Sequence, residues 1–228
     1  MPDYTIRRTP EVPALTGDWD GAIWSRAGTG SISHFLPNSS DHHPRVEFRL
    51  LYDAAWVYVL FRVRDRFVRC VETEFNGPVC RDSCTEFFVE PRAGKGYFNF
   101  EVNCGGTMLC YYVEDPTRTA TGFRKSVPLT PEEGAQVRIY HSMPPVVEPE
   151  IAEAVTWFNE IHIPLTLLEG HVGPLGDPAG QVWRANLYKC GDQTSHPHWG
   201  TWAPIEGASF HAPEYFAPLI FEGYETAG

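Results

Sequence analysis

Residues 56–65 read Trp-Val-Tyr-Val-Leu-Phe-Arg-Val-Arg-Asp, and this stretch is the clearest indication of the fold class. Every second position from 57 to 63 is valine or phenylalanine, which is the alternation of a β-strand with one buried face. A shorter apolar run at 46–51 precedes it, and Tyr-Asp-Ala-Ala at 52–55 separates the two runs. We therefore expect an antiparallel hairpin here.

Similar short apolar runs follow along the chain, separated by turn residues. Twenty glycines and twenty prolines are spread over 228 residues, which suits many short strands and argues against long helices. Three prolines at 143–150 predict an extended surface loop, and 165–169 indicates a helical turn. The further strand candidates are 85–90, 97–103, 107–113, 136–142, 156–164, 181–188 and 219–222. The sequence therefore predicts an all-β fold, a two-sheet antiparallel β-sandwich of jelly-roll or immunoglobulin-like form, as one domain over residues 1–228.

Composition limits the possible partners. Hydrophobic residues make up 43% of the chain, enough for a sizeable core, and the formal net charge is −11 with no run of lysine or arginine. This acidic balance argues against a nucleic acid partner. Residues 1–9 lead into no apolar signal segment, and no apolar run is long enough to cross a membrane. We expect a cytoplasmic protein without a membrane partner, although a secreted chain trimmed of its signal would look the same.

The six cysteines are an even number, but in a domain of this size without a signal they indicate mostly reduced thiols. Cys80 and Cys84 are separated by three residues, whereas a zinc knuckle uses a spacing of two. A packed cluster of thiols is therefore a better interpretation than a metal site.

Two predicted strands carry polar side chains on a common face. If Phe98 and its alternate neighbours enter the core, Asn99 and Glu101 point to the opposite side. The same alternation in 181–188 sends Arg184, Asn186 and Tyr188 outward. Amide, carboxylate, guanidinium and phenol groups suit fixed hydrogen bonds to sugar hydroxyls. An ordinary solvated face is an equally good interpretation of this pattern.

Two tryptophans, Trp199 and Trp202, lie in a segment rich in proline and glycine at 196–204. An indole in a loop suits stacking against the C–H face of a pyranose ring. The alternative is a buried anchor for the loop, and the two interpretations have equal weight. The remaining tryptophans lie in or beside strand patterns and are expected in the core: Trp19, Trp24, Trp56, Trp157 and Trp183.

Other chemistry-bearing residues give weaker signals. The histidines His34, His42, His43, His196 and His198 could converge on a metal, but no spacing matches a known metal-binding pair, so packing roles are favoured. The chain has no nucleophile elbow and no phosphate-binding glycine loop.

Two carboxylates could still face each other as glycoside hydrolysis requires. The candidates are Asp82, Glu86, Glu101 and Glu160. Sequence alone does not supply their separation, so hydrolysis is not favoured. A hydrolase would be distinguished by two carboxylates or a histidine cluster in one deep pocket.

Several ordered motifs together resemble the family 9 carbohydrate-binding modules and their stand-alone relatives. They are Leu-Thr-Gly-Asp-Trp at 15–19, Ala-Ile-Trp at 22–24, Phe-Arg-Leu-Leu-Tyr-Asp at 48–53 running into Val-Tyr-Val at 57–59, and Asp-Ser-Cys-Thr-Glu-Phe-Phe at 82–88. The likeness covers most of the chain, and the last block is its most specific part.

The resemblance implies a β-sandwich that binds the terminal sugar of a glycan between two tryptophans, often with structural calcium, in glycan catabolism and without catalysis. In this chain, Glu86 matches the glutamate of the block at 82–88, and Trp199 or Trp202 matches the second of the family's two sugar-binding tryptophans. The earlier tryptophan, expected six residues before the glutamate, is Cys80 here. We therefore expect a ligand other than glucose or cellobiose, or a clamp built from another ring.

The same sandwich is similar to the haem-carrying subunit of ethylbenzene-dehydrogenase-type enzymes. That resemblance implies a methionine and a lysine as iron ligands, and Met108 and Lys189 are the candidates. A b-type haem electron-transfer domain is therefore the alternative to sugar binding, although haem is disfavoured. A sugar-active hydrolase on the same scaffold is a further alternative.

Overall fold

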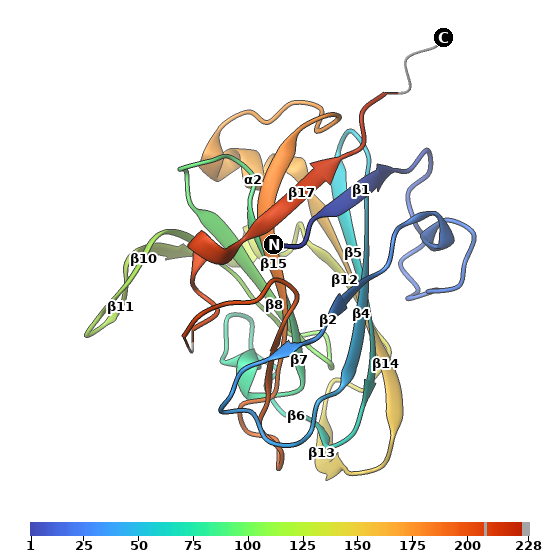
Figure 1. Cartoon of the computed structure of the whole chain (residues 1–228), viewed down its shortest axis with the longest axis vertical. Coiled ribbons are helices and arrows are strands. Elements are labelled where there is room, and N and C mark those ends of the chain that lie inside the picture. Colours follow the sequence, from blue (N-terminus) through green and yellow to red (C-terminus); the bar gives the residue numbers. More distant parts are fainter. Residues whose placement is uncertain (208, 225–228) are drawn as a thin grey trace.

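Two β-sheets, A and B, form the sandwich in a computed structural model that describes residues 1–207 and 209–224 (Figure 1). Sheet A contains, in spatial order, β11 (Gly122–Pro128), β10 (Tyr111–Thr119), β8 (Tyr97–Asn103), β7 (Cys84–Glu90), β15 (Val182–Cys190) and β17 (Ala217–Phe221), with β9 (Met108–Leu109), β16 (Trp199–Thr201) and β3 (His34–Phe35) beside them. Sheet B contains β2 (Gly30–Ile32), β4 (Arg45–Tyr52), β5 (Trp56–Asp65), β14 (Val155–Pro164) and β12 (Arg138–His141). The predicted all-β sandwich is confirmed.

The remaining elements are short. A separate two-stranded ribbon pairs β6 (Val68–Cys70) with β13 (Val147–Ile151). The helices are η1 (Trp24–Arg26), η2 (Val79–Arg81), α1 (Pro131–Gly134), α2 (Leu165–Val172) and η3 (Pro213–Tyr215). None of the helices within 1–207 and 209–224 has the length and apolarity needed to span a membrane.

The strand β1 (Tyr4–Arg8) joins the two sheets and was not predicted. Its first part pairs in parallel with β17 of sheet A, and its last two residues pair in parallel with β4 of sheet B. The sandwich is therefore antiparallel except along this one strand. β1 therefore passes from one layer of the sandwich to the other.

The hairpin of β4 and β5 has the predicted antiparallel register. Asp53 makes its turn, because its Oδ1 accepts hydrogen bonds from the backbone N–H groups of Ala55 at 2.7 Å and Trp56 at 2.8 Å. This side chain replaces a backbone turn, which is a common use of aspartate in tight connections.

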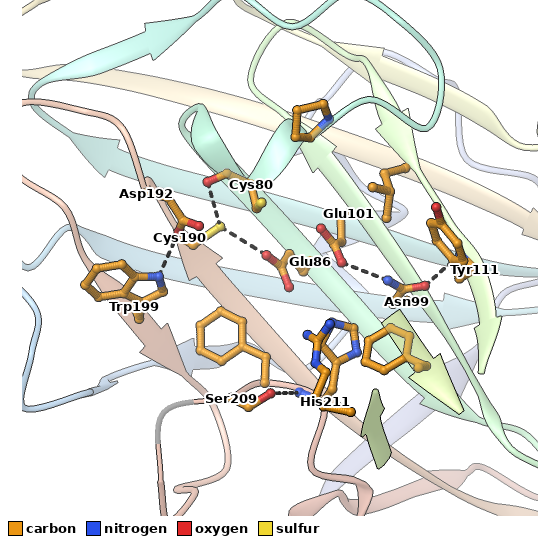
Figure 2. A pocket seen from close by; sticks show the side chains of 15 residues that line it. Cys80, Glu86, Asn99, Glu101, Tyr111, Cys190, Asp192, Trp199, Ser209 and His211 are labelled. Carbon is orange, nitrogen blue, oxygen red and sulfur yellow. Dashed lines mark hydrogen bonds between the residues drawn. The ribbon is translucent and has the colours of Figure 1, made fainter. Parts of the chain in front are cut away.

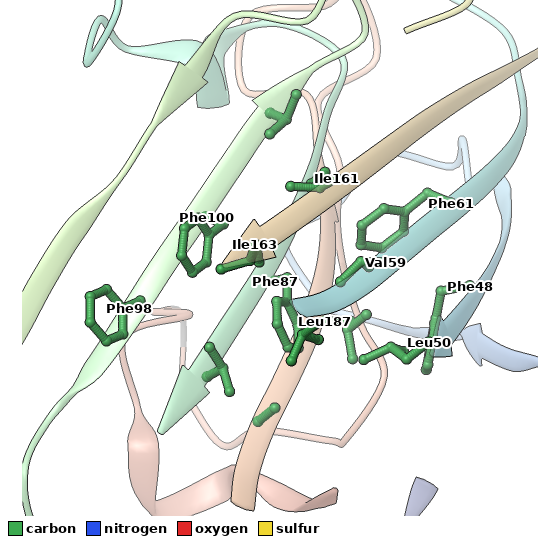
Figure 3. Packing of buried hydrophobic residues seen from close by; sticks show 14 of the residues in the cluster. Phe48, Leu50, Val59, Phe61, Phe87, Phe98, Phe100, Ile161, Ile163 and Leu187 are labelled. Carbon is green, nitrogen blue, oxygen red and sulfur yellow. The ribbon is translucent and has the colours of Figure 1, made fainter. Parts of the chain in front are cut away.

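Alternation along each strand directs apolar side chains into one core between the sheets (Figure 3). Phe87 and Phe100 from sheet A and Val59, Phe61 and Ile161 from sheet B belong to the same buried cluster. Burial of each such side chain contributes about 1.5–3 kcal/mol of hydrophobic free energy. The residues that alternate with Phe87 and Phe100 consequently lie on the outer face of sheet A.

Two predicted boundaries differ from the structure. The second half of the proline-rich stretch expected as a loop belongs to β13, which pairs only with the short β6 and has an irregular register, so Pro149 interrupts no central strand. The expected strand at 107–113 is broken between β9 and β10. The break falls at Cys110, whose N–H donates to Asn76 Oδ1 at 2.9 Å and whose carbonyl accepts from Leu129 instead of a neighbouring strand.

A buried polar network connects the two sheets. Asp65 of β5 lies 3.5 Å from the Lys189 ammonium of β15 and accepts hydrogen bonds from His42 at 2.7 Å and Trp157 at 3.2 Å. Lys189 Nζ also lies 2.8 Å from His198 Nε2. Although burial opposes ionisation, the charge of Lys189 and the hydrogen bond from His42 hold the pKa of the Asp65 carboxyl well below its usual range.

Two of the other candidate metal-ligating histidines pack against aromatic rings, whereas His34 is exposed. His196 stacks on Phe67 and His43 stacks on Phe35. Burial, assisted by Lys189, lowers the pKa of His198 to about 3, so this ring is neutral in the network.

Candidate functional site

A pocket of about 370 Å³ opens on the outer face of sheet A, within the size range of small-molecule sites. Strands β7, β8 and β15 supply its floor, and the chain around β16 and before η3 supplies one side. Figure 2 shows the lining side chains. They are Pro78, Cys80, Glu86, Asn99, Glu101, Leu109, Tyr111, Arg118, Phe123, Cys190, Asp192, Trp199, Ser209, Phe210 and His211.

Two carboxyl groups occupy the middle of this floor. Glu86 of β7 and Glu101 of β8 are register partners across the antiparallel ladder, and they are 2% and 6% exposed. Glu86 Oε1 accepts from the Cys190 thiol at 3.0 Å. Glu101 Oε1 accepts from the Asn99 amide at 2.8 Å.

Burial disfavours the charged form of both groups, and no cation among the described residues contacts either carboxyl. Burial and the neighbouring Glu101 carboxyl raise the pKa of Glu86 well above its usual value. Burial, with Asp192 nearby, raises the pKa of Glu101 to about 7. The pair therefore retains a proton near neutral pH, and a neutral carboxyl can donate as well as accept a hydrogen bond.

Asn99 holds Glu101 in place. Its Nδ2 donates to Glu101, while its Oδ1 accepts from the backbone N–H of Tyr111 at 2.7 Å. Both ends of the amide are engaged, so Glu101 on the same strand and the backbone of β10 fix its orientation. Asn99 therefore positions the carboxyl beside the pocket and links it to β10.

Aromatic side chains border the carboxyl pair. Figure 2 shows Trp199 on one flank and Tyr111 on the other. Trp199 is half-buried, and its indole N–H donates to Asp192 Oδ1 at 2.7 Å, which fixes the plane of the ring. Phe210 lines the same pocket and stacks on Tyr188 with ring centroids 4.1 Å apart. Polar groups flanked by rings can bind a ring-shaped polar ligand.

Comparison with known proteins identifies the family. The family described as Carbohydrate-binding family 9 matches residues 24–221. This chain belongs to carbohydrate-binding family 9. Carbohydrate binding is therefore its class of function. No curated protein matches the chain.

Solved structures agree with this family 9 assignment. A candidate carbohydrate-binding protein from Bacteroides uniformis has a similar structure with a TM-score of 0.83 and 25% identity, over 96% of this chain and 99% of that one. A family 9 module from Caldicellulosiruptor kristjanssonii in complex with cellotriose has a TM-score of 0.65 at 12% identity, over 100% and 97%. The module from the same organism in complex with glucose has a TM-score of 0.64 at 12% identity, over 98% of each chain. At this low identity the two Caldicellulosiruptor structures support the fold alone.

Four of the eight site residues predicted from the sequence of this family 9 chain line the pocket together. They are Glu86, Asn99, Glu101 and Trp199. Trp202 is the clearest correction. It is 6% exposed and packs edge-on against Phe48 in the core, with ring centroids 5.7 Å apart. Trp199 begins β16 and Trp202 follows directly after its end, where the Trp202 N–H donates to the carbonyl of Leu187, and the two indoles lie on opposite sides of sheet A. Trp202 is therefore the buried anchor, not a sugar platform.

Three further predicted residues lie on the expected face but hold the chain between β16 and β17. The Asn186 amide exchanges hydrogen bonds with the backbone of Ala203. Arg184 donates to the carbonyl of Phe216 at 3.0 Å, and the Tyr188 hydroxyl donates to the carbonyl of Phe210 at 2.9 Å. These side chains secure the segment that brings Phe210 to the pocket, and none of the three lines it.

Sequence reasoning missed several lining residues. Tyr111 was part of the alternating pattern of a predicted strand, which was a usable signal for its face. Asp192, Phe210 and His211 lie in irregular segments without any periodic signal. Arg118 lies in the part of β10 beyond the predicted strand end.

One group of donor atoms within 1–207 and 209–224 is close enough to hold a metal. Those of Cys84, Glu86 and Cys190 lie within 4.8 Å of one another. Burial raises the pKa of Cys84 to about 12, which disfavours the thiolate that binds metals. Calcium prefers six to eight oxygen ligands, so this set with two sulfurs does not fit the calcium that the resemblance implied. All six cysteines are free thiols in the structure.

The two haem-ligand candidates lie in different surroundings. Met108 is buried and borders a second cavity, which Lys189 does not line. The Lys189 amine is committed to Asp65, His198 and the carbonyl of Cys190. This arrangement favours a structural role for the lysine.

Proposed function

We propose that this family 9 chain binds one end of a saccharide in the pocket on sheet A. The observation that carries the proposal is the buried pair Glu86 and Glu101 beside the half-buried indole of Trp199 in one cavity. The carboxyl pair supplies hydrogen-bond partners for hydroxyls, and the indole supplies a flat surface for ring C–H groups. The family supports this assignment. Two family 9 modules that share the fold were solved in complex with cellotriose and with glucose.

The aromatic clamp differs from the one that the resemblance implied. Cys80 lines the pocket where the earlier tryptophan was expected. Phe210 and Tyr111 line it as well, and Phe210 packs in the same apolar cluster as Trp199. We propose that Trp199 and Phe210 together provide the apolar surfaces for the sugar ring.

Titration calorimetry after a glycan array tests this proposal. Removal of a stacking ring typically costs about 1–3 kcal/mol, so Trp199→Ala should weaken saccharide binding about 5-fold or more. Trp199→Phe retains a ring and should weaken binding less. Circular dichroism checks that both variants are folded. Equal affinities for wild type and Trp199→Ala would contradict the proposed site.

Glycoside hydrolysis is a second candidate because two carboxyl groups share the pocket. Glu86 and Glu101 are adjacent on the floor of the pocket, whereas a hydrolase places its two carboxyl groups on either side of the scissile bond. Asp82 and Glu160 are buried and accept hydrogen bonds from the backbone elsewhere. Chromatography of oligosaccharides incubated with the protein tests this function, and release of shorter sugars that Glu86→Gln abolishes would establish it.

Calcium binding, a role in glycan catabolism and a cytoplasmic location stay predictions. Calcium is tested by the melting temperature with CaCl₂ and with EDTA, since a bound ion stabilises the folded state.

A further inference from the structure

The pocket gathers acidic side chains. Glu86, Glu101 and Asp192 line it, and Arg118 is the one lysine or arginine among its lining residues. Arg118 is exposed, and its guanidinium lies 4.1 Å from the centre of the Phe123 ring at the edge of the site. His211 adds no charge near neutral pH, because burial lowers its pKa to about 3.

The carboxyl pair has unused capacity to accept hydrogen bonds. In the described residues, Glu86 and Glu101 each have a hydrogen-bond partner at Oε1 and none at Oε2. Neither Oε2 atom is fully buried, so both are accessible from the pocket. The partners at Oε1 are a neutral thiol and a neutral amide, which do not compensate the charges of two adjacent carboxylates.

Buried like charges need a counter-charge or a proton. Asp65 has Lys189 as its counter-charge within the protein. No cation among the described residues contacts Glu86 or Glu101, so a bound proton reduces the charge of the pair in the free protein. A cationic ligand would supply the missing charge and displace the proton.

We propose that the saccharide preferred at this site carries a free amino group, so that its ammonium lies between Glu86 and Glu101 while its ring packs against Trp199. This inference rests on the sugar-binding function proposed above and names its ligand class. An ammonium has three donors and no acceptor, which matches a site of carboxylate acceptors better than a hydroxyl does. Charge-assisted hydrogen bonds are also about twice as strong as neutral ones.

The test uses pairs of sugars that differ only in the amine. Glucosamine and galactosamine are titrated against glucose and galactose by calorimetry at pH 7, with EDTA present to exclude metal effects. N-acetylglucosamine is the neutral control for the size of the substituent. We expect at least one amino sugar to bind 10-fold or more tightly than its hydroxyl counterpart, with the preference reduced by added salt.

Matched variants separate charge from shape. Glu101→Gln removes one charge at nearly constant volume, and the affinity ratio of amino sugar to neutral sugar should fall toward one. Glu132→Gln removes an exposed carboxylate outside the pocket and should leave the ratio as in wild type.

Each outcome decides a different point. A neutral sugar that binds at Trp199 as tightly as its amino counterpart would overturn the ligand class and leave the proposed function intact. Preference for N-acetylglucosamine would overturn it in the same way. Absence of binding by the whole glycan array would overturn both proposals.

Discussion

Asp65 and the pair of Glu86 and Glu101 are all buried carboxyl groups, yet the structure treats them in opposite ways. Asp65 lies between the sheets with Lys189 and is ionised, so its pKa is low. The glutamates lie under the pocket without a contacting cation, so their pKa values are high. Burial alone does not decide the charge of a carboxyl group, because the partner decides it. The paired site holds the sandwich together, and the unpaired site is available to a ligand.

The largest expected effect is the loss of the partner at the paired site. Lys189→Met leaves the Asp65 charge buried without compensation, which should lower the free energy of unfolding by about 3–5 kcal/mol. Chemical denaturation at pH 7 measures this loss. Lys189→Met combined with Asp65→Asn should recover a large part of it, since the uncompensated charge is gone. A single variant within 1 kcal/mol of wild type would show that the ion pair is not needed.

A smaller effect of opposite sign is expected at the unpaired site. The folded protein holds the Glu101 proton up to a pKa of about 7, whereas the ordinary value is 4.5. Stability therefore falls as pH rises from about 4.5 to about 7 and is lower above that window. Glu101→Gln should flatten this fall and raise the free energy of unfolding above pH 7 by on the order of 1–3 kcal/mol.

Denaturant unfolding across pH 4 to 8 checks the sign. Wild type and Glu101→Gln should differ little at pH 4 and most at pH 8, and the exposed control Glu132→Gln should follow wild type throughout. A loss of stability in Glu101→Gln at pH 8 would contradict the absence of a counter-charge.

The smallest effect is expected at the edge of the pocket. Asp192→Ala removes the acceptor for the Trp199 indole N–H and frees the ring to rotate. One hydrogen bond contributes about 0.5–1.5 kcal/mol, so saccharide affinity should fall about 2- to 10-fold, and stability should fall by no more than about 1.5 kcal/mol. Calorimetry and thermal melting measure the two quantities. Unchanged affinity would show that orientation of the indole does not matter for binding.

Strand faces could be predicted from the sequence, because alternation is a local property. The alternation in residues 56–65 and 97–103 placed Phe100 in the core and both Asn99 and Glu101 outside it, and the structure agrees. The floor of the candidate site was therefore accessible to sequence reasoning.

The walls of the site were not accessible in this way, because they depend on contacts between distant segments. Trp199 and Trp202 have the same local composition around them, and only pairing of β16 with β15 decides which indole faces the pocket. The position of Phe210 depends on side chains of β15 such as Tyr188, whose partners lie more than twenty residues away. The sequence showed donors and acceptors on β15 but not that the protein itself uses them.

The most direct test of the account is a crystal structure of the protein with the saccharide that binds most tightly in calorimetry. The account predicts the sugar ring on the Trp199 indole with polar atoms in contact with Glu86 and Glu101. A sugar bound in another place, such as the second cavity beside Met108, with the carboxyl pair untouched, would contradict it.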